Sequence, residues 1–158
     1  MEITEFIKRL HYSGTKKAYF CHCRGNTVLN VALGGTVIQD IETKIPQAIS
    51  HYQQAERHDA THDIQIEENC RLYDIFNKSS IRVNSINHQA IDKLGSSLKT
   101  AAAAPDGIIA AVEAVDQSSS LFMGVQWNPE EMASEDPYMQ GFFKTFIYEC
   151  SNKDITVD

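Results

Sequence analysis

AYFCHCRGNTVLNVALGG, residues 18–35, reads as a strand, a sharp turn and a helix in direct succession. Residues 18–21 are short and apolar with two aromatic side chains, which is typical of a buried strand. A helical stripe of apolar side chains follows at Val28, Leu29, Ala32 and Leu33. Gly34 then supplies the left-handed conformation with which helices commonly end. The pattern predicts a strand over 17–22 and a helix over 24–33.

Cys23 stands at the junction of the predicted strand and helix. A side chain there is held at the end of a strand and faces a helix N-terminus, which favours a negatively charged thiolate. Gly25 follows two residues later and suits the tight backbone of such an elbow. The arrangement predicts a cysteine nucleophile.

Three segments of the chain resemble three motifs of one protein family and occur in the same order as in that family. The first runs from Cys-Arg-Gly at 23–25 into LNVALGGT at 29–36 and QDI at 39–41. The second is VNSINHQA at 83–90, which is similar to the run Val-Asn-Ser-x-His-His-Gln-Ala. The third is GVQWNPE at 124–130, which is similar to Gly-Val-Gln-Trp-His-Pro-Glu. Together they resemble class I glutamine amidotransferases, and most closely the branch of the γ-glutamyl-γ-aminobutyrate hydrolases (peptidase C26 type).

The resemblance implies an α/β fold with a mostly parallel sheet flanked by helices, of the flavodoxin-like type, with a hairpin insertion. In the family several strand–helix units precede the elbow, whereas here one amphipathic helix at 1–12 is predicted there. We therefore expect an N-terminally truncated domain over 1–150 and a flexible tail over 151–158. A central strand at 17–22 would then leave an uncovered edge or apolar face. We expect a homo-oligomer, or a partner chain that covers it.

Local patterns predict the other elements. Strands are expected over 64–66, 81–83 and 121–127, the last of them central in the sheet. A hairpin is expected from 98–104 and 108–115 around the turn Pro105-Asp106-Gly107. Helices are expected over 45–49 and 137–150, the second with an apolar side made of Met139, Phe142, Phe143, Phe146 and Ile147.

The family chemistry implied by the resemblance is hydrolysis of a γ-glutamyl amide through a cysteine thioester. Cys23 matches the nucleophile, and Glu130 matches the carboxylate that orients the catalytic histidine. The histidine position itself holds Asn128. Asparagine has no group that titrates near neutral pH, so it cannot move a proton. We expect hydrolysis of a γ-glutamyl small molecule to be lost or weak.

Substrate contacts implied by the resemblance fall on Arg24, Gly25, Ser85, His88 and Gln89. Two residues of the elbow depart from the pattern: Cys21 stands where glycine is usual, and Thr27 where glutamine is usual. The absent units would also supply a backbone N–H of the oxyanion hole. These departures leave a second interpretation open, a non-catalytic module that binds a ligand or a protein in the same pocket.

Other histidines offer rival chemistry. His88 is not the triad histidine of the family, and strand alternation would point His22 away from the residue that follows it. We expect structural roles for both. A metal site could be made of His51, His58 and His62. That segment reads as a loop without a cysteine or carboxylate at ligand spacing, so we expect chance clustering, no metal and no cofactor.

Composition sets further bounds. The 158 residues carry a net charge of −7, which argues against binding to a nucleic-acid backbone. No apolar run is long enough for a membrane span, and the N-terminus lacks a signal-peptide core. The four cysteines, Cys21, Cys23, Cys70 and Cys150, form neither a disulfide framework nor a zinc motif. We expect reduced thiols and a cytoplasmic location.

Overall fold

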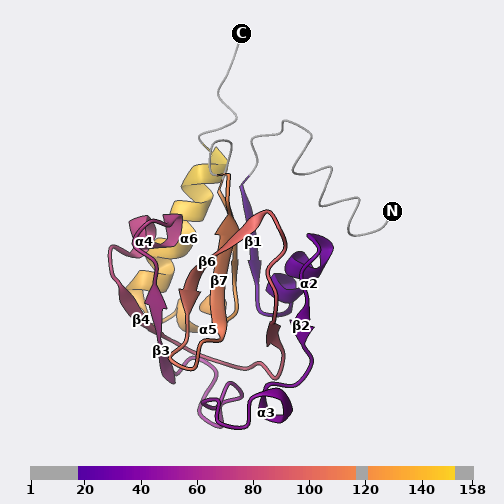
Figure 1. The fold of residues 1–158 in the computed structure, drawn as a ribbon. Coiled ribbons are helices and arrows are strands. Elements are labelled where there is room, and N and C mark those ends of the chain that lie inside the picture. The colour runs from indigo at the N-terminus through magenta and orange to yellow at the C-terminus, as the bar shows by residue number, and fades with distance from the viewer. Residues whose placement is uncertain (1–17, 117–120, 152–158) are drawn as a thin grey trace.

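The computed structural model describes residues 18–116 and 121–151 (Figure 1). In chain order its elements are β1 (Tyr19–His22), α2 (Arg24–Ala32), β2 (Val37–Ile38), α3 (Ile41–Lys44), β3 (His62–Ile66), α4 (Arg71–Phe76), β4 (Ser80–Val83), β5 (Ala90–Ile91), β6 (Leu98–Ala103), β7 (Ile109–Ala114), β8 (Phe122–Val125), α5 (Pro129–Met132) and α6 (Pro137–Ser151).

Six strands form one sheet in the order β1-β8-β7-β6-β3-β4, and β2 and β5 form a separate antiparallel pair. β1 pairs with β8 in parallel, and the other neighbours within the six-stranded sheet are antiparallel. The predicted α/β class with flanking helices is confirmed. The sheet is mixed, with parallel pairing at the β1 end, because short hairpins such as β6–β7 join only antiparallel strands.

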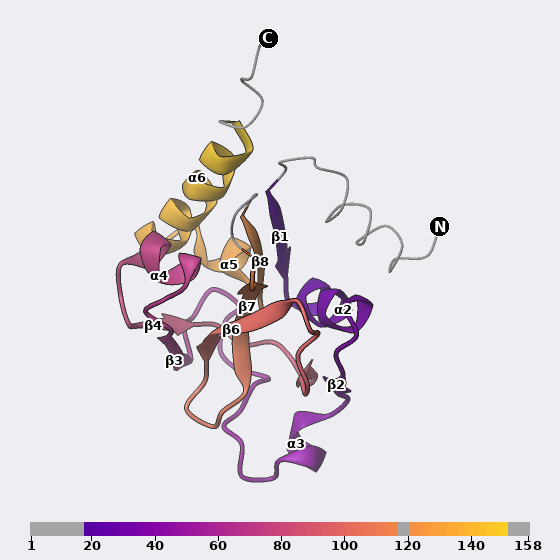
Figure 2. The same ribbon diagram turned by 45° about the horizontal axis from the view of Figure 1, so that its top comes forward.

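Helices cover both faces of this sheet, with α2 on one face and α4 and α6 on the other (Figures 1 and 2). Leu29 of α2 packs against Val112 and Phe122. On the opposite face Phe142 of α6 is buried against the rings of Phe20 and Phe76, with centroids 5.0 and 5.6 Å away. Burying a phenylalanine side chain contributes about 1.5–3 kcal/mol, so these contacts fix α6 on the sheet.

Several predicted elements are confirmed. The strand and helix on either side of residue 23 are β1 and α2, and Gly34 has the positive φ of 92° expected after the helix. The hairpin is β6–β7, and Gly107 in its turn also has a positive φ, 85°. The strand expected to be central is β8, which is buried along its whole length between β1 and β7. The closing helix is α6.

Some local expectations are wrong. No helix forms over 45–49, where Ala48 N–H donates to the carbonyl of Ile45 in a turn. The helix comes earlier, as α3, because the Asp40 side chain accepts from the Thr43 N–H at 3.0 Å and caps its start. β1 lies at an edge of the described sheet and is half-buried rather than buried.

Two residues that the sequence pattern assigned to apolar helix faces are exposed to solvent in the structure. Val28 of α2 is 39% exposed and Ile147 of α6 is 62% exposed. In each helix the buried stripe is narrower than the apolar pattern in the sequence. The predicted helix over 1–12 lies outside the described residues, and so does the predicted tail over 151–158 except Ser151, which ends α6. Among the described helices, none has the length and apolar character that crossing a membrane requires.

Candidate active site

The backbone of Cys23 makes the turn between β1 and α2. Its φ of 51° and ψ of −122° lie outside the helix and strand regions, which is unusual for a residue with a side chain. The Cys23 N–H donates to the carbonyl of Val125 at 2.9 Å, which ties the turn to the end of β8. The predicted elbow is confirmed, and the cysteine itself takes the left-handed φ.

Gly25 contributes to the elbow differently from the expectation. Its own φ is not positive. A methyl group added at Gly25 would lie 3.5 Å from Cβ of Cys21, which is ordinary contact. Cys21 therefore fits beneath the first turn of α2, and its burial raises the pKa of its thiol.

The thiol of Cys23 is held by an asparagine that the sequence reasoning did not select. Sγ of Cys23 donates to Oδ1 of Asn87 at 3.1 Å, and Nδ2 of Asn87 donates to the carbonyl of Gln126 at 2.8 Å. The Asn87 N–H donates to the carbonyl of His51 at 2.7 Å. These bonds fix the amide that faces the thiol. The position of Asn87 within the second family segment was the available signal.

Cys23 opens onto a cleft of about 290 Å³. It is lined by Cys23, Arg24, Thr27, Ile86, Asn87, His88, Gln89 and Gln126. Three of the predicted substrate contacts, Arg24, His88 and Gln89, therefore lie at this cleft. Gly25 does not line it, and Ser85 is buried elsewhere with its hydroxyl donating to the carbonyl of His51 at 2.9 Å.

Asn128 and Glu130 lie together at the end of β8, as the motif implied. Nδ2 of Asn128 donates to Oε1 of Glu130 at 3.0 Å. Asn84 holds the Asn128 backbone at both ends: it accepts from the N–H at 2.9 Å and donates to the carbonyl at 3.0 Å. The Oδ1 atom of Asn128 is buried and has no hydrogen-bond partner in the described part of the chain. The site keeps a positioned amide and carboxylate, but the amide cannot accept and release a proton.

Two more charged side chains lie beside Glu130 and Cys23. Nδ1 of His22 is 3.4 Å from Oε2 of Glu130. Nε of Arg57 donates to Glu131 at 2.7 Å, and this bond is the main cause that raises the pKa of Arg57. Smaller contributions come from the charges of Glu130 and Cys23. Neither residue was predicted as part of the site.

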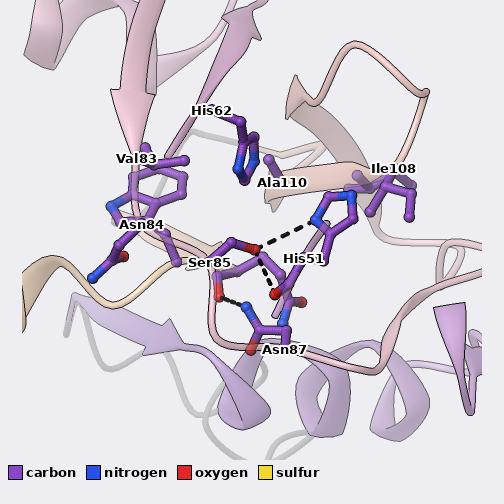
Figure 3. A pocket seen from close by; sticks show the side chains of 11 residues that line it. His51, His62, Val83, Asn84, Ser85, Asn87, Ile108 and Ala110 are labelled. Carbon is purple, nitrogen blue, oxygen red and sulfur yellow. Dashed lines mark hydrogen bonds between the residues drawn. The ribbon is translucent and has the colours of Figure 1, made fainter. Parts of the chain in front are cut away.

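A second polar cluster lies around His51 and Ser85 (Figure 3), in a pocket that shares Asn87 and Gln126 with the lining of the cleft. Nε2 of His51 is 2.8 Å from Oδ2 of Asp106, and Nδ1 of His51 is 3.4 Å from Oγ of Ser85. This has the composition of a serine–histidine–aspartate triad. However, the enclosed cavity there measures about 10 Å³, room for one water molecule and not for a substrate. The cluster is part of the polar interior.

The three histidines considered as metal ligands do not all face one another. The rings of His51 and His62 lie 5.2 Å apart, whereas His58 faces Asp59 at 3.6 Å. Among the described residues no group of three or more histidine, cysteine, aspartate or glutamate side chains could hold a metal ion. Burial lowers the pKa of His62 to about 4, which keeps this imidazole neutral at physiological pH.

Known proteins share sequence with this chain over most of its length. A sequence model of the peptidase C26 family matches residues 6–130. Protein NtpR of Enterococcus hirae is 39% identical over 134 residues, which cover 84% of this chain and 55% of that protein. The γ-glutamyl-γ-aminobutyrate hydrolase PuuD of Escherichia coli strain K12 is 30% identical over 139 residues, covering 84% of this chain and 54% of that enzyme. The chain thus spans about half the length of these curated relatives.

A solved structure shares the fold. The glutamine amidotransferase of Methylobacillus flagellatus superimposes with a TM-score of 0.68 at 10% identity, covering 94% of this chain and 69% of that one. At this identity the likeness concerns the fold alone.

Proposed function

This chain belongs to the peptidase C26 family of glutamine amidotransferase-like proteins, and we propose that it binds a γ-glutamyl compound at Cys23 and hydrolyses its amide bond slowly. The reaction would pass through a thioester on Cys23. The observation that supports this most directly is the thiol itself. It stands on a strained elbow at the edge of a 290 Å³ cleft and is oriented by Asn87.

The cleft offers groups suited to a γ-glutamyl head. Arg24 and His88 line it, and a guanidinium pairs well with a carboxylate such as the α-carboxylate of the head group. The amides of Gln89 and Gln126 line the same cleft and can bond to the amino and carbonyl groups of a ligand. Arg24 also opens α2, and the first N–H groups of a helix lack partners within it. Its amide is suited to stabilise the oxyanion that forms when the thiol attacks.

Slow turnover follows from residue 128. Removing one member of a catalytic triad typically costs several orders of magnitude in rate, while binding and oxyanion stabilisation leave a residual activity. Asn128 preserves the bond to Glu130 and therefore the shape of this part of the site. The cost falls on proton transfer.

Covalent labelling tests this proposal. A diazoketone analogue of glutamine should add to Cys23, seen as one mass increment in the intact protein. The background variant Cys150→Ser removes an exposed thiol, and Cys23→Ser is the negative control. Slow release of para-nitroaniline from γ-glutamyl-para-nitroanilide, dependent on Cys23, should accompany the labelling. If neither adduct nor release exceeds the Cys23→Ser level, the hydrolase proposal is wrong.

The second candidate is a non-catalytic module that binds a γ-glutamyl ligand in the same cleft. Asn128 favours it, because its amide satisfies Glu130 without providing a base. Calorimetric binding of a γ-glutamyl compound that is unchanged in Cys23→Ala, together with no adduct, would identify this function.

A further inference from the structure

The carboxylate of Glu130 contacts two side chains at once. Its Oε1 accepts from Nδ2 of Asn128 at 3.0 Å, and its Oε2 lies 3.4 Å from Nδ1 of His22. Glu130 therefore faces an imidazole, although not one supplied by residue 128. The side chains of His22 and Glu130 are each 43% exposed, so water reaches both.

The nitrogen that faces Glu130 determines what the other nitrogen of His22 can do. A carboxylate beside Nδ1 favours the tautomer that carries its proton there, which leaves the lone pair of Nε2 free to accept one. A triad carboxylate uses the same relation to set the tautomer of its histidine. The ring of Phe20 stacks against His22 with centroids 5.9 Å apart and restricts its rotation.

His22 is also the residue that directly precedes the nucleophile in the chain. Consecutive Cα atoms are about 3.8 Å apart across a trans peptide. Alternation along a strand would send these two side chains to opposite faces, but β1 ends at His22. Cys23 lies beyond the strand with a φ of 51°, so the alternation rule does not separate them.

We propose that His22 is the proton acceptor for Cys23, acting through a water molecule and oriented by Glu130. This inference rests on the proposed γ-glutamyl hydrolysis. The thiol proton passes to Nε2 of His22, and sulfur forms a bond to the γ-carbonyl carbon. The C–N bond then breaks, and the amine leaves with the proton returned by His22. Water hydrolyses the thioester and restores the thiol.

The charged and titratable groups placed around His22 are Glu130, Cys23, Arg57 and Glu131. Glu130 on α5 faces it directly, and Cys23 follows it in the chain. Arg57 and Glu131 form an ion pair whose guanidinium is coupled electrostatically to Glu130 and to Cys23. The test variants leave Cys23, Arg57 and Glu131 unchanged, and Glu130 changes only in Glu130→Gln and in the double variant.

Single-turnover release of para-nitroaniline from γ-glutamyl-para-nitroanilide, measured from about pH 5 to 9, tests the assignment. His22→Gln, which cannot titrate, should lower the rate by at least about tenfold and abolish the rise with pH near neutrality. Glu130→Gln should also lower the rate, and the double variant should be no slower than the slower single variant, because both act on one step. His58→Gln is the matched control: it is 44% exposed, faces Asp59 instead of Glu130 and should react like the parent protein.

Two further readouts separate the possible failures. Adding Asn128→His to His22→Gln should restore the rate, which excludes a loss of folding as the cause of the defect. An unchanged rate and pH profile in His22→Gln would overturn the assignment, and so would a defect that Asn128→His does not restore. If the parent protein releases no para-nitroaniline, the hydrolase proposal has failed. The pH dependence of iodoacetamide labelling at Cys23 then decides the role of His22 alone: near neutral pH, below the range in which a free thiol ionises, labelling should be slower in His22→Gln than in the parent, and identical pH profiles would overturn the assignment.

Discussion

Replacing Asn84 should destabilise the protein more than any exposed polar substitution. Its side chain is fully buried and makes three hydrogen bonds: one from the N–H of Asn128 at 2.9 Å, one to the carbonyl of Asn128 at 3.0 Å and one to the carbonyl of Arg57 at 2.7 Å. Each such bond contributes about 0.5–1.5 kcal/mol net, and unpaired buried groups add a penalty. We expect Asn84→Ala to lower the free energy of unfolding by about 3 kcal/mol.

Urea denaturation followed by tryptophan fluorescence measures this loss, since Trp127 is buried beside Asn128. With a slope of about 2 kcal/mol per molar urea, the midpoint should fall by about 1.5 M. Asn84→Asp keeps an acceptor for the Asn128 N–H but sets a buried carboxylate oxygen against the carbonyl oxygens of Arg57 and Asn128, so it should destabilise the protein more than Asn84→Ala. Gln65→Ala is the control, because it removes one exposed bond to Ser80 and should change stability by less than about 0.5 kcal/mol. A loss below about 1 kcal/mol in Asn84→Ala would refute the view that this side chain clamps the end of β8.

Four further outcomes are expected. Asn128→His should raise the rate of para-nitroaniline release by at least about 100-fold, because it returns a proton carrier beside Glu130; an unchanged rate would show that another missing group limits turnover. Burial lowers the pKa of His62 from 6.5 to about 4, so its neutral form stabilises the fold fully above pH 6.5 and this contribution is lost as the pH falls through 4. Urea midpoints should fall over that range, and less so in His62→Phe. Gly124→Ala should destabilise, because its methyl group would collide with Oδ1 of Asn26, whereas Gly141→Ala in α6 has open space and should stabilise by about 0.5–1 kcal/mol; calorimetric melting distinguishes the two signs. We propose that a second copy of the chain covers the outer edge of β1, so light scattering at high concentration should give a dimer, and a monodisperse monomer would count against it.

Local sequence was sufficient to predict the elements that are bounded by clear turn or helix-end residues. The elbow at Cys23 lies between an apolar strand and an apolar helical stripe, and Gly34 and Gly107 mark positions with positive φ. The turn Pro105-Asp106-Gly107 located the hairpin correctly. In these places one short pattern decides the conformation, and no distant residue has to be known.

The parts that failed or were missed depend on contacts between distant residues. The segment at 45–49 looked helical, yet the cap at Asp40 starts the helix earlier. Ser85 sits in a family segment, but its hydroxyl turns toward His51 and away from the cleft. The pairing of His22 with Glu130 joins β1 to α5, which are far apart in the sequence, so the residues next to either side chain could not predict it. Sequence patterns identified the segments of the site and left the direction of individual side chains undetermined.

The wall of the cleft is joined to residues 51–53 by backbone bonds. Gln53 N–H donates to the carbonyl of Ser85, Asn87 N–H donates to the carbonyl of His51, and Tyr52 and Ile86 form a bridge between these bonds. Hydrogen exchange at these amides should therefore occur in one cooperative opening. A ligand would meet a preformed surface, and its association should follow a single exponential without a slow phase for loop closure.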